Sequence, residues 1–214
     1  MSPGAQTNGE QITLPPVLIY IHGYNSSPQS IKAEMLRNYI HDHHLDIEFL
    51  APEVSPLPDR AIESLCRLVE QKGAEHVRLV GSSMGGFYAT YLAEKYGVHA
   101  VLINPAVKPQ KLLLQYLGEN THPYSGETYV FDQSHIETLE QLDVDPHHYP
   151  DRYLLMVQTG DETLDYRLAV DKYQNCPSII EEGGSHRFSG FENWIPYILE
   201  FLDLTEISDL TDSE

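Results

Sequence analysis

A serine between two glycines carries the strongest chemical signal in this sequence. Residues 81–85 read Gly-Ser-Ser-Met-Gly, with an apolar stretch before them and a helical pattern after them. The pattern G-x-S-x-G in that context is typical of a strained strand-to-helix turn that presents a nucleophilic serine. Only Ser83 fits the frame, because Ser82 would need a glycine where Val80 stands. A phosphate-binding loop is excluded, since no lysine follows Gly86.

A serine hydroxyl is a good nucleophile only when a base accepts its proton and an acid orients that base. Asp161 and His186 follow two later apolar stretches, so the chain has the order Ser, Asp, His that this kind of turn requires. We therefore predict Asp161 as the acid and His186 as the base. Asp165 and Glu162 stay as alternatives for the acid, and Asp165 is expected to begin or cap the next helix.

Negative charge that develops on a substrate oxygen needs backbone N–H donors close to the serine. One donor is expected from Met84, the residue after the nucleophile. The other is expected from Tyr24, which follows a His22-Gly23 turn after the first apolar stretch. We expect His22 itself to have a structural role.

The remaining histidines and the two cysteines point to neither a metal nor a cofactor. Residues 41–46 read His-Asp-His-His-Leu-Asp, and they do not fit H-x-H-x-D-H because Leu45 stands where that pattern needs an acid. Cys66 and Cys176 are far apart and lack C-x-x-C spacing, which argues against a disulfide or zinc framework. No metal and no cofactor are therefore predicted.

Short apolar stretches alternate with helical patterns along most of the chain. The stretches suit strands that are buried on both faces of a parallel sheet. They are Val17–Ile21, Ile47–Leu50, Val77–Val80, Ala100–Ile103, Tyr153–Val157 and Ser178–Ile180. Helical patterns cover about 31–40, 62–69, 84–96 and 191–202. This alternation predicts an α/β fold, an open, doubly wound and mainly parallel sheet with helices on both faces.

The segment from Pro105 to Pro150 interrupts the alternation. We expect no strand in it and two short helices, the second starting at a capping box formed by Ser134 and Glu137. Their apolar faces would consist of Leu112, Leu113, Tyr116 and Leu117, and of Ile136, Leu139 and Leu142. An insertion after a strand commonly lies over the carboxyl edge of such a sheet, where ligands bind. We therefore predict a small helical lid over the site.

The composition is that of a soluble and strongly acidic protein. Hydrophobic residues make up 41% of the 214, and the formal net charge is −19. Such a charge repels nucleic acids and anionic membrane surfaces. No apolar stretch is long enough to span a bilayer, so we expect a cytoplasmic protein without membrane insertion.

The predicted lid segment is itself acidic. It holds seven carboxylates against two lysines, so it should slow the approach of anionic substrates. Arg187, beside the predicted base, is the candidate for holding an anion despite that field.

Taken together, these motifs resemble the α/β-hydrolase superfamily and, within it, the small YqiA-type esterase family. The resemblance runs from about Val17 to Leu202 and rests on YIHGYNSSPQS, GSSMGGFYATYLAEKYG, LINPAVKP, QTGDETLDYR and GGSHRFSGFE. It implies a compact hydrolase that starts at the strand before the His-Gly turn and lacks the antiparallel strands that usually precede it. It also implies hydrolysis of a small carboxylic ester or acyl thioester without a cofactor. Carried over residue by residue, it gives Ser83 as nucleophile, Asp161 as acid and His186 as base.

The expected organisation is a flexible leader over 1–14, an α/β-hydrolase domain over 15–202 with the lid segment at 105–150, and an acidic tail over 203–214. Two alternatives remain beside the esterase: a non-catalytic hydrolase fold that serves as a binding module, and a serine hydrolase that acts on amides or transfers acyl groups. One triad serves all of these chemistries, so the sequence alone does not separate them. No feature of the sequence indicates an oligomeric state.

Overall fold

Six parallel strands form the central sheet of the protein. The structure, a computed structural model, describes residues 14–146 and 148–205. Along the sheet the strands follow the order β2-β1-β3-β4-β7-β8. They are β1 (Val17–Ile21), β2 (Glu48–Leu50), β3 (Val77–Ser82), β4 (His99–Ile103), β7 (Tyr153–Gln158) and β8 (Ser178–Glu181). The predicted open parallel sheet is confirmed, and each strand lies within two residues of the apolar stretch that predicted it.

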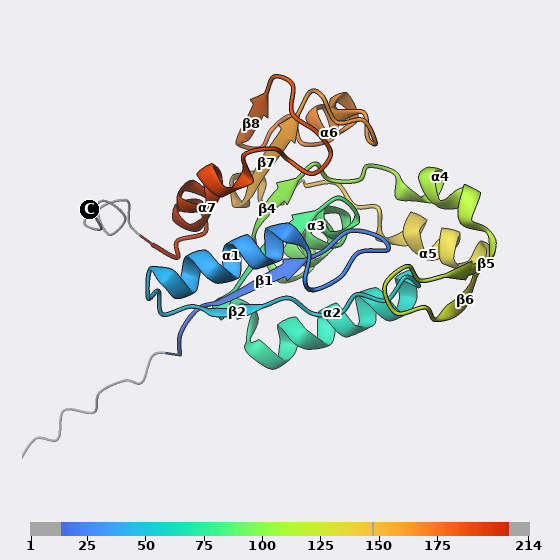
Figure 1. The fold of residues 1–214 in the computed structure, drawn as a ribbon, viewed down its shortest axis with the longest axis horizontal. Helices are drawn as coiled ribbons and strands as arrows, with labels where there is room; N and C mark the ends of the chain where they lie inside the picture. Colours follow the sequence, from blue (N-terminus) through green and yellow to red (C-terminus); the bar gives the residue numbers. More distant parts are fainter. Residues whose placement is uncertain (1–13, 147, 206–214) are drawn as a thin grey trace, which may run out of the picture.

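Helices cover both faces of this sheet (Figure 1). On one face, Leu18 and Tyr20 of β1 belong to the core that includes α1 (Ile31–Asp42) and α7 (Ile195–Phe201). On the other face, the alternate residues of β1 share a core with three helices. These are α2 (Pro58–Lys72), α3 (Met84–Tyr96) and α6 (Tyr166–Lys172). Because both faces are covered, every residue of β1 is buried, which is why its sequence is apolar throughout.

The segment after β4 contains two strands, so our expectation that it has none was wrong. It consists of α4 (Pro109–Leu113), an antiparallel hairpin of β5 (Gly118–Thr121) and β6 (Thr128–Phe131), and α5 (Gln133–Leu142). The four residues of β5 are polar or glycine and largely exposed. A strand that buries neither face leaves no alternating apolar signal in the sequence.

The capping box of α5 is formed by other residues than predicted. Asp132 is the N-cap, where its carboxylate accepts a hydrogen bond from Ser134 N at 2.9 Å. The His135 ring accepts one in return from Asp132 N, also at 2.9 Å. The expected pair of Ser134 and Glu137 was therefore placed two residues too late.

The longer helix of this segment, α5, packs against the core. Ile136, Leu139 and Leu142 are buried as predicted, and α5 packs against α2. Of the four residues expected on the apolar face of the first helix, Leu113 is buried and Tyr116 packs partly buried against the core, whereas Leu112 and Leu117 are 40% and 45% exposed. The predicted apolar face was therefore right for Leu113 and Tyr116 and wrong for Leu112 and Leu117, because α4 ends at Leu113 and a short 3-10 turn follows.

Other structural elements agree with the sequence patterns. The last helical pattern divides into a 3-10 turn at Phe191–Trp194 and the helix α7. Residues 1–13 of the expected leader and 206–214 of the expected tail lie outside the described residues. Within the described part of the chain, no helix is both long and apolar enough to cross a membrane.

Candidate active site

Ser83 occupies the turn between β3 and α3 in a strained backbone conformation. Its φ of 56° and ψ of −119° are unusual for a residue with a side chain. Ser83 N donates to Ile103 O on β4 at 3.0 Å, and Ser83 O accepts from Gly86 N and Ala106 N at 2.9 and 3.0 Å. Hydrogen bonds on both sides of the residue hold this conformation, as strained functional positions require.

The glycines around Ser83 allow the turn to pack against β1. A Cβ atom on Gly85 would lie 1.9 Å from Ile21 O, and one on Gly81 would lie 2.4 Å from Gly85 O. Both contacts are with backbone atoms that cannot move aside. The glycine pattern of the sequence therefore follows from the close approach of α3 to β1 and β3.

The structure brings Ser83, His186 and Asp161 into one chain of hydrogen bonds. His186 Nε2 lies 3.1 Å from Ser83 Oγ, and His186 Nδ1 lies 2.7 Å from Asp161 Oδ2. Since a carboxylate only accepts, Nδ1 carries the proton and Nε2 is free to accept from the serine hydroxyl. The three residues come from the ends of β3, β7 and β8, which meet at the carboxyl edge of the sheet.

Asp161 is fully engaged on both oxygens. Its Oδ1 accepts hydrogen bonds from Thr163 N and Leu164 N, both at 2.8 Å, and its side chain is only 2% exposed. Burial acts to raise the pKa of Asp161, but the hydrogen bonds from His186 and the two backbone N–H groups outweigh it. The net effect lowers the pKa below 3.8, so the carboxylate is ionised at neutral pH.

The two alternative acids have other partners. Asp165 is the N-cap of α6 and accepts from Arg167 N at 3.1 Å, as predicted for a capping residue. Glu162 accepts from His186 N at 3.0 Å, so it contacts the backbone of the histidine and not its ring. Among these three carboxylates, only Asp161 contacts the His186 imidazole.

The expected N–H donors lie beside the serine. Gly23 packs against Ser83, since a Cβ on Gly23 would be 3.6 Å from Ser83 Oγ. Tyr24 and Met84 line the same small cavity of about 10 Å³ together with Gly23. Met84 is the first residue of α3, where backbone N–H groups have no acceptor within the helix. This placement is compatible with an oxyanion hole formed by these two residues.

His22 connects the end of β1 to the following loops. Its Nε2 accepts from Val54 N at 3.2 Å, so Nδ1 carries the proton and donates to Gly23 O at 2.9 Å. Burial is the main cause that lowers the pKa of His22 below 6.5, which keeps the ring neutral. These contacts agree with the structural role expected for His22.

Two buried polar residues that we did not single out in the sequence hold the loop of His186. Asn104 Nδ2 donates to Ser185 O and His186 O, both at 3.1 Å. Gln158 Oε1 accepts from Ser185 N and Ser189 N at 3.0 and 2.8 Å. Each stands at or just after the carboxyl end of a buried strand, and that position is the signal that could have indicated them.

A cleft of about 350 Å³ opens over the serine. Ser83 and His186 line it together with Lys32, Arg187 and Tyr124. Tyr124 lies between β5 and β6 and is 69% exposed, so the hairpin is the part of the inserted segment that reaches the cleft. The hairpin is held in place by Tyr129, whose hydroxyl lies 2.8 Å from that of Tyr24.

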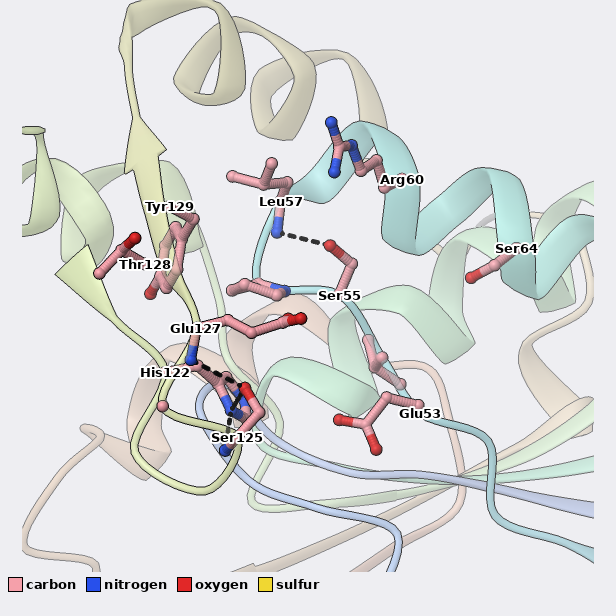
Figure 2. A pocket seen from close by; sticks show the side chains of 13 residues that line it. Glu53, Ser55, Leu57, Arg60, Ser64, His122, Ser125, Glu127, Thr128 and Tyr129 are labelled. Carbon is pink, nitrogen blue, oxygen red and sulfur yellow. Dashed lines mark hydrogen bonds between the residues drawn. The ribbon is translucent and has the colours of Figure 1, made fainter. Parts of the chain in front are cut away.

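A larger cavity of about 970 Å³ lies between the hairpin and the start of α2. Figure 2 shows Glu53, Arg60, His122 and Glu127 around it. None of Ser83, Asp161 and His186 lines this cavity. The candidate site is therefore identified by the hydrogen bonds of Ser83, His186 and Asp161, and not by the volume of the cavity.

Several histidines outside the site contact other side chains. His43 stacks on Tyr39 with ring centroids 3.9 Å apart, and His41 contacts Asp42. In the described ranges, no group of three or more histidine, cysteine, aspartate and glutamate side chains is arranged to hold a metal ion. Cys66 and Cys176 are both free thiols.

Comparison with known sequences shows a match over almost all of the described chain. Residues 17–203 match a family model described as "Uncharacterised protein family (UPF0227)". A UPF0227 protein of Serratia proteamaculans is 24% identical over 200 residues, which cover 88% of this chain and 99% of that protein. A UPF0227 protein of Yersinia pseudotuberculosis has the same identity and coverage.

Several solved structures have the same fold. Est1E from Butyrivibrio proteoclasticus superposes with a TM-score of 0.67 at 14% identity, covering 92% of this chain and 89% of its own. The mouse α/β-hydrolase domain-containing protein 10 also superposes with a TM-score of 0.67, at 17% identity, covering 88% of this chain and 90% of its own. A monoacylglycerol lipase from Paleococcus ferrophilus superposes with a TM-score of 0.61, at 14% identity, covering 87% of this chain and 96% of its own. At sequence identities this low, the structural similarity is evidence for the fold alone.

Proposed function

The chain belongs to the UPF0227 family and is a member of the α/β-hydrolase superfamily, and on this basis we propose that it is a serine hydrolase acting on a carboxylic ester or an acyl thioester. One observation carries the proposal. The Ser83 hydroxyl, the His186 ring and the Asp161 carboxylate are aligned at 3.1 and 2.7 Å beside an open cleft. The similar solved structures support it, because they include an esterase domain and a lipase.

In the proposed first step, Ser83 Oγ attacks the carbonyl carbon of the substrate. His186 Nε2 accepts the hydroxyl proton as the new bond forms, and Asp161 stabilises the resulting imidazolium through Nδ1–H. The negative charge on the carbonyl oxygen is stabilised by N–H groups, for which Tyr24 and Met84 are the proposed donors. The tetrahedral intermediate then expels an alcohol or thiol, which takes its proton from His186.

In the second step, water hydrolyses the acyl-enzyme. His186 accepts a proton from a water molecule while the water oxygen attacks the acyl carbon. His186 then gives that proton to Ser83 Oγ, which leaves as the free hydroxyl while the carboxylic acid is released. No step requires a cofactor. Since Asp161 is ionised and buried, it keeps the imidazole in the same tautomer for both steps.

The experiment that tests this function combines active-site labelling with a substrate panel. The full chain is treated with a fluorophosphonate, and we expect one adduct, on Ser83, that the Ser83→Ala variant lacks. Esters, thioesters and amides with the same acyl group are then compared, and we expect turnover of esters or thioesters.

Each other outcome contradicts part of the proposal. No adduct and no turnover would mean that the fold serves as a binding module. An adduct with faster amide cleavage, or with acyl transfer to an added alcohol exceeding hydrolysis, would replace the esterase by one of these related chemistries.

A further inference from the structure

Two basic side chains line the cleft beside the candidate nucleophile. Lys32 lies in the first turn of α1, and Arg187 directly follows His186. Both line the same cleft as Ser83. The whole chain has only 13 lysines and arginines against 32 acidic residues, so a pair of cations at this place is a local reversal of its charge.

The two residues are held close to each other. Lys32 Nζ donates a hydrogen bond to Arg187 O at 3.0 Å, which links α1 to the loop of His186. Burial lowers the pKa of Lys32 to about 8, with repulsion from Arg187 as the next cause and attraction to Asp161 opposing both. The two cations thus repel each other, which makes their placement side by side unfavourable.

Within the described residues, no carboxylate forms an ion pair with either cation, and Asp161 attracts Lys32 only from a longer distance. Of the eleven other lysines and arginines, five have an ion-pair partner within 4.0 Å in the described part of the chain, and these are Arg37, Arg67, Lys72, Arg167 and Lys172. Neither Lys32 nor Arg187 has such a partner in the part of the chain that the structure describes. Both oxygens of Asp161 are already used by His186 and by the backbone of the loop after β7.

We propose that Lys32 and Arg187 form an anion subsite, and that the substrate is an ester or thioester carrying a carboxylate or phosphate group. Resting on the proposed function, this inference names the substrate class of the same site. An anion between the two side chains would relieve their repulsion and accept charge-assisted hydrogen bonds from both. The arginine fork suits the two oxygens of a carboxylate or phosphate, and the lysine adds a point charge.

The test compares matched substrates that differ only in charge. For the acyl side, the pair is the 4-nitrophenyl monoester of adipic acid and its methyl-capped diester. For the alcohol side, the pair is butyryl glycerol phosphate and monobutyrin. kcat/KM is measured for each with the wild type, with Arg187→Gln, and with Lys32→Met combined with Arg187→Gln.

We expect the wild type to prefer the charged member of at least one pair by about ten-fold or more, the effect of a hydrogen bond between charged groups. The double variant should lose this preference, so that its kcat/KM for the charged member falls by about ten-fold or more beyond any fall for the neutral member. Arg187→Lys should keep part of the preference, because it keeps the charge but loses the two-pronged arginine fork. The pair that responds shows on which side of the scissile bond the anion lies.

A matched control removes the same charge elsewhere. Lys111→Met combined with Arg60→Gln neutralises two exposed cations that do not line the cleft, and should leave the preference unchanged. Equal turnover of charged and neutral members by the wild type would overturn the subsite. A parallel loss for both members in the double variant would show a structural role only. Failure of fluorophosphonate labelling would instead contradict the proposed hydrolase itself.

Discussion

Three carboxylates lie in the loop after β7, and each has a different partner. Asp161 contacts the His186 ring, Glu162 accepts a hydrogen bond from the His186 backbone, and Asp165 caps the first turn of α6. We predict that Asp161→Asn lowers kcat by about 10⁴, because the amide cannot stabilise the imidazolium and favours the wrong tautomer. Asp165→Asn should retain most of the activity, since asparagine is an equally good N-cap. Ester turnover by the two purified variants checks this, and the reverse order would assign the acid to Asp165.

The pKa of Lys32 gives a second prediction at this scale. Because it is lowered to about 8, Lys32 carries its charge below that pH and loses it as the pH rises further. Asp161 remains ionised over this range, because its pKa is lowered. The preference for the charged member of a substrate pair should therefore fall between about pH 7 and pH 9, with the midpoint displaced upward when the anion is bound.

The measurement is the ratio of the two kcat/KM values at each pH, in which any change shared by both substrates cancels. In Lys32→Met the ratio should be independent of pH over the same range. A ratio that changes equally in both proteins would rule out Lys32 as the titrating group.

Residue types and order were sufficient to predict Ser83, Asp161 and His186 as neighbours, since parallel strands bring their carboxyl ends to one edge. The approach of Lys32 to Arg187 could not be predicted in that way. The residues are 155 positions apart, and one of them lies on a helix and not at a strand end. Their contact depends on how α1 packs against the loop of His186.

At the scale of elements, Gln158 joins the end of β7 to the loop that carries His186. Gln158→Met removes the acceptor of Ser185 N and Ser189 N. We predict a loss of about 1–2 kcal/mol in the free energy of unfolding, and a drop of about ten-fold or more in the rate of fluorophosphonate labelling of Ser83 because the base is misplaced. Urea denaturation and labelling kinetics check this, with exposed Gln115→Met as the control. An unchanged labelling rate would show that Gln158 does not position His186.

The inserted segment divides into a packed part and a part that reaches the cleft. Tyr124→Ala should change the preference among acyl chain lengths without affecting stability, because this exposed side chain lines the cleft. Leu113→Ala should lower stability by about 2–4 kcal/mol, because its buried side chain packs in the core. Chain-length profiles and thermal unfolding of both variants separate the roles. If Leu113→Ala alone altered the profile, the helices would be the lid after all.

Elements buried on both sides were predictable and the hairpin was not, for one physical reason. The strand β7 is buried at every position, so its run of apolar residues is a direct consequence of its place in the sheet. The hairpin strands β5 and β6 contribute one buried residue, Phe131, between them. Their position is set by single contacts, such as that of Tyr129 with Tyr24, and a periodic pattern of apolar residues does not predict contacts of this kind.

At the scale of the whole molecule, the net charge of −19 and the two cleft cations act on an anionic substrate in opposite directions. Salt weakens both effects, since screening acts over about 8–10 Å near physiological ionic strength. In the double variant of Lys32 and Arg187, only the repulsive field remains. We predict that its kcat/KM for the charged substrate rises with salt, whereas that of the wild type rises less or falls.

Neutral substrates should show little dependence on salt in either protein, which makes them the control. Measurements between about 0.01 and 0.5 M sodium chloride cover the range in which the screening length changes most. The same salt dependence in both proteins would mean that the two cations do not act on the substrate.

The strand order has a consequence for the nascent chain. Ser83 comes early in the chain, but its N–H bond to Ile103 O requires β4, and its proposed base follows β8, the last strand of the sheet. During synthesis the serine therefore leaves the ribosome long before His186 exists. Until then its hydroxyl has no partner to accept its proton, and partly synthesised chains should be unable to react with cellular esters. The order Ser, Asp, His thus delays activity until nearly the whole domain has been made.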